Sequence, residues 1–130
     1  MRKFLILIIF FIPNISFSNE ALINSLKDGK KIIFIRHAIA PGSGDPKSFN
    51  IKKCSTQRNL NDEGKIQSKK IGNFFKINKI KISKILSSEW CRCKDTAKIA
   101  FGKFETFNAL NSFYETRFQK NRSSQIRDLR

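Results

Sequence analysis

The sequence contains very few of the residues from which metal sites are built. His37 is the only histidine, and it is distant from the three cysteines Cys54, Cys91 and Cys93. Zinc sites use cysteines and histidines in closely spaced pairs, so this pattern argues against a zinc site. We expect no metal and no other cofactor. An odd number of cysteines allows at most one disulfide bridge and leaves one thiol over.

Acidic residues are also scarce. The chain has 10 of them against 26 lysines and arginines, which gives a net charge of +16. Such an excess suits nucleic acid, an anionic membrane surface or phosphorylated substrates. The basic residues are scattered from Lys27 to Arg130, and no basic run exceeds two residues. This distribution argues against a dedicated nucleic-acid site and favours a solvated basic surface, with a binder of membranes or polyanions as an alternative.

The longest apolar run is too short to span a membrane. It covers nine residues, 4–12, whereas a spanning helix needs about 20. Two basic residues precede the run and small residues follow at positions 16 and 18, which is the pattern of a secretory signal. We therefore predict a signal peptide at 1–18, cleavage after Ser18, and a periplasmic or secreted protein without a transmembrane span. An uncleaved anchor is the alternative.

The remaining residues, 19–130, are predicted to form one α/β domain. Helices are expected at 19–27, from 62 to about 76 and from about 89 to 101, with strands at 31–35, 80–86 and, more weakly, 104–110. The apolar run 31–35 lacks alternation, which is typical of a parallel strand buried on both faces. Helices that alternate with strands predict a mainly parallel sheet. The residues expected to face inward from the second helix are Ile66, Ile71, Phe74 and Phe75.

Arg36 and His37 follow the predicted strand 31–35 directly. In open α/β sheets, ligands bind beyond the carboxyl ends of the strands. A guanidinium matches the geometry of phosphate oxygens, and a neutral imidazole can attack phosphorus. The pair therefore predicts a phosphate site with His37 as nucleophile. The alternative is a strand that merely ends in two polar residues.

Arg92 lies in a similar place, in the first turn of the helix that follows the predicted strand 80–86. The free N–H groups and partial positive charge of a helix N-terminus attract anions. Arg92 is therefore a second candidate phosphate ligand, although most arginines are surface residues.

Three segments resemble motifs of the histidine phosphatase superfamily, which has the phosphoglycerate-mutase-like fold. Arg36-His37-Ala38 resembles its Arg-His-Gly or Arg-His-Ala signature. Residues 59–64 resemble its Leu-Thr-x-x-Gly helix start, and residues 87–97 resemble its Ser-Ser-x-x-x-Arg-Ala-x-x-Thr-Ala segment. The order and spacing agree from residue 32 to about 101. The resemblance implies an α/β fold with a three-layer, Rossmann-like sheet.

The same resemblance implies a phosphomonoesterase that forms a phosphohistidine on His37, with Arg36 and Arg92 bound to the non-bridging oxygens; export follows from the predicted signal peptide. Arg58 is a further candidate ligand because it lies just before the second helix, and the family signature does not require it. Glu115 is the candidate proton donor because it is the only carboxylate near the expected place, although it does not align with the family's acid, and a solvated surface glutamate is the alternative. The substrate would be a phosphorylated small molecule or envelope component. A non-catalytic phosphate-binding protein of the same fold is the alternative.

Members of this family have a second histidine late in the chain, and this sequence has none. We therefore expect the fold to be incomplete at its C-terminus. The strand that carries the second histidine would lie between 31–35 and 80–86. Without it, we expect little phosphatase activity and a broad thermal transition.

The resemblance also bears on the cysteines, because Cys93 takes the place of a small buried alanine in the family. A bridge between Cys91 and Cys93 is disfavoured, since residues two apart on a helix point in different directions. We predict that Cys54 pairs with Cys91 in an oxidising compartment, closing a loop of about 37 residues.

Overall fold

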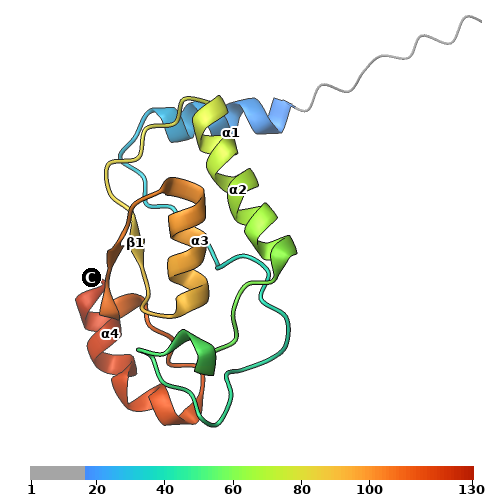
Figure 1. Cartoon of the computed structure of the whole chain (residues 1–130). Helices are drawn as coiled ribbons and strands as arrows, with labels where there is room; N and C mark the ends of the chain where they lie inside the picture. The colour runs from blue at the N-terminus through green and yellow to red at the C-terminus, as the bar shows by residue number, and fades with distance from the viewer. Residues whose placement is uncertain (1–16) are drawn as a thin grey trace, which may run out of the picture.

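The computed structural model describes residues 17–130, whose path is shown in Figure 1. Its helices are α1 (Phe17–Lys27), α2 (Asp62–Ile77), α3 (Cys91–Phe101) and α4 (Arg122–Asp128), and its strands are β1 (Leu86–Ser87) and β2 (Glu105–Thr106). Short 3-10 turns occur at η1 (Cys54–Thr56), η2 (Asn108–Leu110) and η3 (Thr116–Asn121). Within this part of the chain, no helix combines the length and apolar character needed to cross a bilayer. The predicted signal peptide lies outside the described residues, except for the two residues with which α1 begins.

Helices α1, α2 and α3 lie where the sequence predicts them, because their end signals are local, whereas α4 was not predicted. Asn61 is the N-cap of α2, and its side chain accepts a hydrogen bond of 2.8 Å from the Gly64 N–H. This bond satisfies one of the donors that every helix N-terminus leaves free. Gly102 ends α3 in the left-handed conformation, with a φ of 77° that glycine adopts without strain.

The predicted strand at 31–35 is wrong. These residues form no strand, and Ile32 and Phe34 are 84% and 78% exposed. The predicted strands at 80–86 and 104–110 shrink to β1 and β2, which pair in parallel with Leu86 opposite Glu105. A strand persists only where a neighbouring strand pairs with its backbone. Segment 31–35 has no such neighbour among the residues that the structure describes. The parallel pairing is confirmed and is consistent with an incomplete α/β fold, but a two-stranded sheet does not establish three layers.

The core lies where α2 and α3 run side by side, with β1 against α3 (Figure 1). Phe75 is buried as predicted, and its ring meets that of Phe101 edge to face at 5.4 Å. The prediction that Ile66 and Phe74 also face inward is wrong, since they are 53% and 39% exposed. The face of α2 that meets α3 is narrower than the apolar pattern suggests.

Gly64 allows the first turn of α2 to approach the segment after His37. A Cβ at this position would overlap the carbonyl oxygen of Ile39 and lie 2.9 Å from its carbonyl carbon. Both obstructing atoms belong to the backbone, so no side-chain rotation relieves the overlap. Gly64 thus fixes the distance between α2 and the residues that follow His37.

We expect a Gly64→Ala variant to be less stable, although alanine is the better helix former. Alanine gains up to about 1 kcal/mol of helix propensity, but the overlap with Ile39 costs about 1–3 kcal/mol through backbone displacement. Urea denaturation followed by circular dichroism measures the net change in unfolding free energy. Lys69→Ala on the exposed side of α2 is the control and should change stability by less than about 0.5 kcal/mol. A Gly64→Ala variant more stable than the parent would contradict this close packing.

Candidate active site

His37 is held in one tautomer by its own backbone. The Nδ1 atom lies 2.7 Å from the carbonyl oxygen of Ala38. A carbonyl only accepts hydrogen bonds, so Nδ1 carries the proton of the neutral ring and donates it. The lone pair of the neutral imidazole is then on Nε2. The half-buried ring therefore presents Nε2 as its nucleophilic atom.

Side chains from α3 and α2 position the backbone that follows this ring. The Thr96 hydroxyl accepts a 3.0 Å bond from the Ala38 N–H and donates a 2.7 Å bond to the carbonyl of Arg92. From α2, the Gln67 side chain accepts a 2.9 Å bond from the Ile39 N–H. The segment after His37 is therefore fixed by hydrogen bonds to both α2 and α3.

Positive charge surrounds His37. Partial burial lowers the pKa of His37, and the guanidinium groups of Arg92, Arg58 and Arg36 lower it further, while the hydrogen bond to Ala38 acts in the opposite direction. The net effect is a pKa below the ordinary histidine value of about 6.5. The tertiary structure thus brings together the predicted nucleophile and the three predicted arginines. The environment that favours a bound anion also keeps the imidazole neutral.

Because His37 is the only histidine, its titration can be followed without assignment ambiguity. We expect the imidazole resonances in an NMR pH titration to report a pKa below about 6.5. Arg36→Gln removes a positive charge and should raise this pKa, whereas Lys47→Gln, a control at an exposed position in the loop after the site, should not. A histidine that titrates above 6.5 in the parent chain would contradict the described environment.

Asp45 holds Arg92 in place through a buried ion pair. Nη1 of Arg92 lies 2.8 Å from Oδ1 of Asp45 and Nη2 lies 3.1 Å from Oδ2. The two side chains are only 9% and 2% exposed. Asp45 also accepts bonds from the Trp90 indole at 2.8 Å and from the Arg58 N–H at 3.0 Å. Burial acts to raise the pKa of Asp45, but the hydrogen bonds from Arg92, Arg58 and Trp90 outweigh it and lower the pKa.

The third donor atom of Arg92 has no such partner. Its Nε is buried and has no hydrogen-bond partner among the described residues. Buried donors are rarely left unpaired, and an unpaired one in a candidate site calls for a ligand. Nη1 donates to Asp45 and to the Arg58 carbonyl, and Nη2 donates once to Asp45, so Nε and the second N–H of Nη2 are the donors of Arg92 that remain for phosphate oxygens. We find Asp45 to be a positioning residue that sequence reasoning missed.

Gln57 and Arg58 lie in the segment between η1 and α2. Arg58 donates to the Gly44 carbonyl at 3.0 Å through Nε and to the Ala40 carbonyl through Nη1, which ties it to the loop after His37. Gln57 is buried, and its Oε1 accepts a 2.9 Å bond from the Cys91 N–H at the start of α3. Gln57 therefore serves the helix end, whereas Arg58 contributes charge to the site.

Glu115, the candidate proton donor, lies against the same loop. Its Oε1 accepts a 3.1 Å bond from the Asp45 N–H, and its Oε2 pairs with Arg117 at 2.6 Å. Phe118, three residues further on, packs with Phe49 and Trp90 at ring separations of 5.4 Å. The segment around Glu115 is thus anchored beside the loop that carries Asp45.

A disulfide bridge joins Cys54 to Cys91, the residue before Arg92. It connects η1 to the first turn of α3, next to the Gln57 contact. Cys93 keeps a free thiol, and burial raises its pKa. The bridge therefore fixes the backbone that carries Arg92, while the thiol of Cys93 is held in its unreactive form.

The sequence match agrees with this geometry. The family model described as histidine phosphatase superfamily (branch 1) matches residues 32–125. The chain belongs to the histidine phosphatase superfamily. A search of curated proteins and a search of solved structures found no match. The superfamily includes phosphatases and mutases, and residues 17–130 contain no group of acidic, histidine and cysteine side chains arranged to hold a metal ion.

Proposed function

We propose that this superfamily member is an exported phosphomonoesterase that acts through a phosphohistidine on His37. The observation that carries the proposal is the tautomer of His37, whose Nδ1–H donates to Ala38 and leaves Nε2 as the nucleophile. Three arginines lie close enough to lower the pKa of that ring, and membership of a superfamily of phosphatases and mutases supports phosphoryl transfer. The substrate would be a phosphorylated small molecule or an envelope component, since an excess of basic residues favours anionic substrates.

The reaction has two steps in this proposal. Nε2 of His37 attacks phosphorus, the ester P–O bond breaks, and the leaving oxygen takes a proton from the acid. Water then attacks phosphorus and gives a proton to the carboxylate left by the acid, the P–N bond breaks, and inorganic phosphate, neutral His37 and the protonated acid result. Arg92 and Arg36, with Arg58, would bind the non-bridging oxygens, where negative charge must be stabilised. Fixed donors such as the Arg92 guanidinium need no reorganisation during the reaction.

Export is a separate part of the proposal. It is supported by the signal-like pattern of residues 1–18 and by the Cys54–Cys91 bridge, because disulfides persist in oxidising compartments. N-terminal sequencing of the protein recovered from the periplasm or the medium tests it. A mature N-terminus at Asn19 is expected, and protein that starts at Met1 and stays in the cytoplasm would contradict it.

The activity is tested with the full chain and p-nitrophenyl phosphate. Because the sequence predicts little activity for this chain, we expect only slow release of p-nitrophenol that depends on His37. In base-quenched samples we expect a tryptic peptide that carries one phosphoryl group on His37. Vanadate or phosphate that binds without any turnover or covalent intermediate would support the non-catalytic alternative instead. Binding that weakens steeply with salt and shows no preference for phosphomonoesters would indicate a general polyanion binder.

Glu115 is proposed as the proton donor, and its role depends on the leaving group. We expect Glu115→Gln to slow hydrolysis of an alkyl phosphate by about 100-fold, because a poor leaving group needs protonation. Hydrolysis of p-nitrophenyl phosphate should change much less, since nitrophenolate leaves without a proton. Glu105→Gln, a control at an exposed carboxylate in β2, should affect neither substrate. Equal losses on both substrates would instead assign Glu115 to holding the Asp45 loop.

A further inference from the structure

The outward face of α2 carries apolar side chains that no other part of the described chain covers. Ile66 and Ile77 are 53% and 77% exposed, and Phe74 is 39% exposed. Positions 66, 70, 74 and 77 follow one another at intervals of three or four residues, so their side chains form one ridge along the helix. We call Ile66, Lys70, Phe74 and Ile77 the outer ridge of α2. Its apolar character is unusual, because the solvent face of a helix is normally polar.

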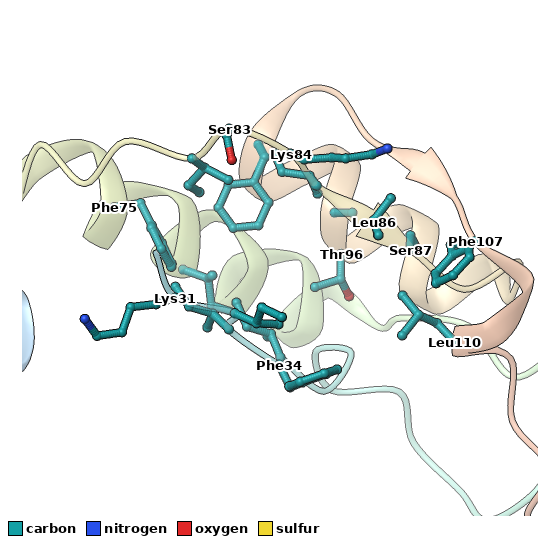
Figure 2. Close-up of a pocket in the computed structure, with 18 of the residues that line it drawn as sticks. Lys31, Phe34, Phe75, Ser83, Lys84, Leu86, Ser87, Thr96, Phe107 and Leu110 are labelled. Carbon is teal, nitrogen blue, oxygen red and sulfur yellow. The ribbon is translucent and has the colours of Figure 1, made fainter. Parts of the chain in front are cut away.

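The outer ridge does not face the gap between residues 31–35 and 80–86, in which the family resemblance places a further strand. The residues of α2 that line this gap are Ile71 and Phe75, and Figure 2 shows Phe75 among the side chains there. Phe75 follows Ile66 by two and a half helical turns, which places the two side chains on opposite sides of α2. A strand in the gap would therefore contact the inner face of α2 and leave the outer ridge exposed.

The region around the outer ridge is basic. Residues 64–88 contain seven lysines and no acidic residue. Among these, Lys70, Lys76 and Lys79 lie in or directly after the C-terminal half of α2, are exposed, and form no ion pair within the part of the chain that the structure describes. The two acids of α2 are both in its first turn. The C-terminal half of the ridge thus combines apolar side chains with unpaired positive charge.

An anionic lipid surface complements this combination better than a protein does. A bilayer interface takes apolar side chains into its acyl boundary and attracts lysines to its headgroups without a matched shape. A stable protein interface needs about 800 Å² of matched surface on each partner, whereas three apolar side chains on one convex helix form only a narrow strip. A second copy of this chain would oppose lysines with lysines, because each copy carries a net charge of +16.

We propose that the outer ridge of α2 docks this protein on a membrane surface that contains anionic phospholipids. Phe74 and Ile77 enter the boundary between headgroups and acyl chains, since they lie in the half of the helix that has no acidic residue. Lys70, Lys76 and Lys79 bind the lipid phosphates.

Docking at this end of α2 leaves the candidate active site accessible. The site meets the helix at Gly64, which lies against the backbone of Ile39. At about 1.5 Å per residue, Gly64 and Ile77 are roughly 20 Å apart along the helix axis. The protein would thus be held at the lipid surface with its phosphate site open to solution.

Co-sedimentation of the full chain with phospholipid vesicles tests the proposal. A mixture of phosphatidylglycerol and phosphatidylcholine supplies the anionic surface, and pure phosphatidylcholine is the lipid control. We expect the anionic vesicles to bind the chain at least about tenfold more tightly, and we expect added salt to weaken this binding by screening the charges. The measurement requires no turnover, so its result does not depend on the proposed phosphatase activity.

Two triple variants separate this face from the net charge of the protein. The first neutralises the lysines of the ridge region: Lys70→Gln, Lys76→Gln and Lys79→Gln. The second neutralises exposed lysines in the loop after His37: Lys47→Gln, Lys52→Gln and Lys53→Gln. The first should weaken binding by about 100-fold, because each lysine near an anionic surface contributes about fivefold. The second removes the same charge away from α2 and should weaken binding by less than about fivefold.

Single variants at two highly exposed isoleucines separate the outer ridge from the gap. Ile77→Asp places a negative charge in the ridge and should weaken binding by more than about tenfold. Ile77→Ser adds no charge and should still weaken binding by about fivefold, through lost apolar contact. Ile32→Asp changes a side chain that is 84% exposed and lines the gap, and should leave binding unchanged. Circular dichroism should show that all three variants remain folded.

Four results would overturn the proposal. Absence of vesicle binding, or equal affinity for pure phosphatidylcholine, would reject an anionic lipid surface as the partner. Equal losses in the two triple variants would assign lipid binding to net charge and not to α2. Loss of binding in Ile32→Asp but not in Ile77→Asp would assign it to the exposed segment 31–35. Self-association that Ile77→Asp abolishes, without vesicle binding, would identify a second copy as the partner of the ridge.

Discussion

A His37→Ala variant should lose phosphoryl transfer while it remains folded. His37 is the only histidine, so no neighbouring imidazole can replace it as nucleophile. When several catalytic residues act together, removal of the nucleophile lowers turnover by at least about a thousandfold. Rates of p-nitrophenyl phosphate hydrolysis and the phosphoryl content of the protein measure the loss.

Phosphate binding should survive this substitution, because Arg92 is held by Asp45 and not by His37. Equilibrium binding of vanadate by the variant checks that the arginines are still in place. Lys69→Ala, at an exposed position of α2, is the control and should keep full activity. Turnover by His37→Ala equal to that of the parent would sink the assignment of His37 as nucleophile.

An Asp45→Asn variant should be strongly destabilised. The substitution leaves the Arg92 guanidinium buried without a counter-charge, and loss of one partner of a buried ion pair costs about 3–5 kcal/mol. The Trp90 indole and the Arg58 N–H also lose a charged acceptor. Chemical denaturation of the parent and variant measures the change. Where the variant is still folded, we expect weaker vanadate binding, because Arg92 is no longer oriented.

Low pH should destabilise the parent protein as the Asp45→Asn substitution does, because protonation also removes the negative charge of Asp45. The pKa of Asp45 is lower in the folded protein than in the unfolded chain, so the unfolded state binds the proton more readily. The stabilisation is complete above the unfolded value of about 4 and is lost as the pH falls below it. Asp45→Asn should lack this acid-dependent loss.

Asp62→Asn is the control for the Asp45 substitution. Asp62 forms its pair with Lys65 on the exposed side of α2, where solvent screens the charges. Little change in stability is expected. Equal effects of the two substitutions would show that the Asp45–Arg92 pair is not buried in solution.

Local signals were enough to predict α1, α2 and α3, but not α4. The Asn61 cap and the acids that follow it act within one turn of the chain, so their effect can be read from neighbouring residues. The buried face of α2 was predicted less well. Ile66 and Phe74 were expected to face inward because they are apolar, yet both are exposed. Which apolar face is covered depends on a partner helix that the local pattern does not reveal.

The sequence by itself also determined the family. A motif of adjacent Arg36 and His37, a second motif with Arg92 and Thr96, and their spacing were sufficient to predict the superfamily, which the family model confirms, and to propose one phosphate site. The motif residues also contact one another in the folded chain, because the Thr96 hydroxyl accepts a hydrogen bond from the Ala38 N–H.

Only the tertiary structure decided which residues surround that chemistry and which apolar segments are covered. Asp45 and Arg92 are 47 positions apart, and a lone carboxylate in a Gly- and Pro-rich loop gives no sign of its partner. Segment 31–35 has the sequence of a buried strand, yet it is exposed and unpaired in the described chain. An ion pair and a strand both require a partner brought from elsewhere, and local sequence does not encode where that partner lies.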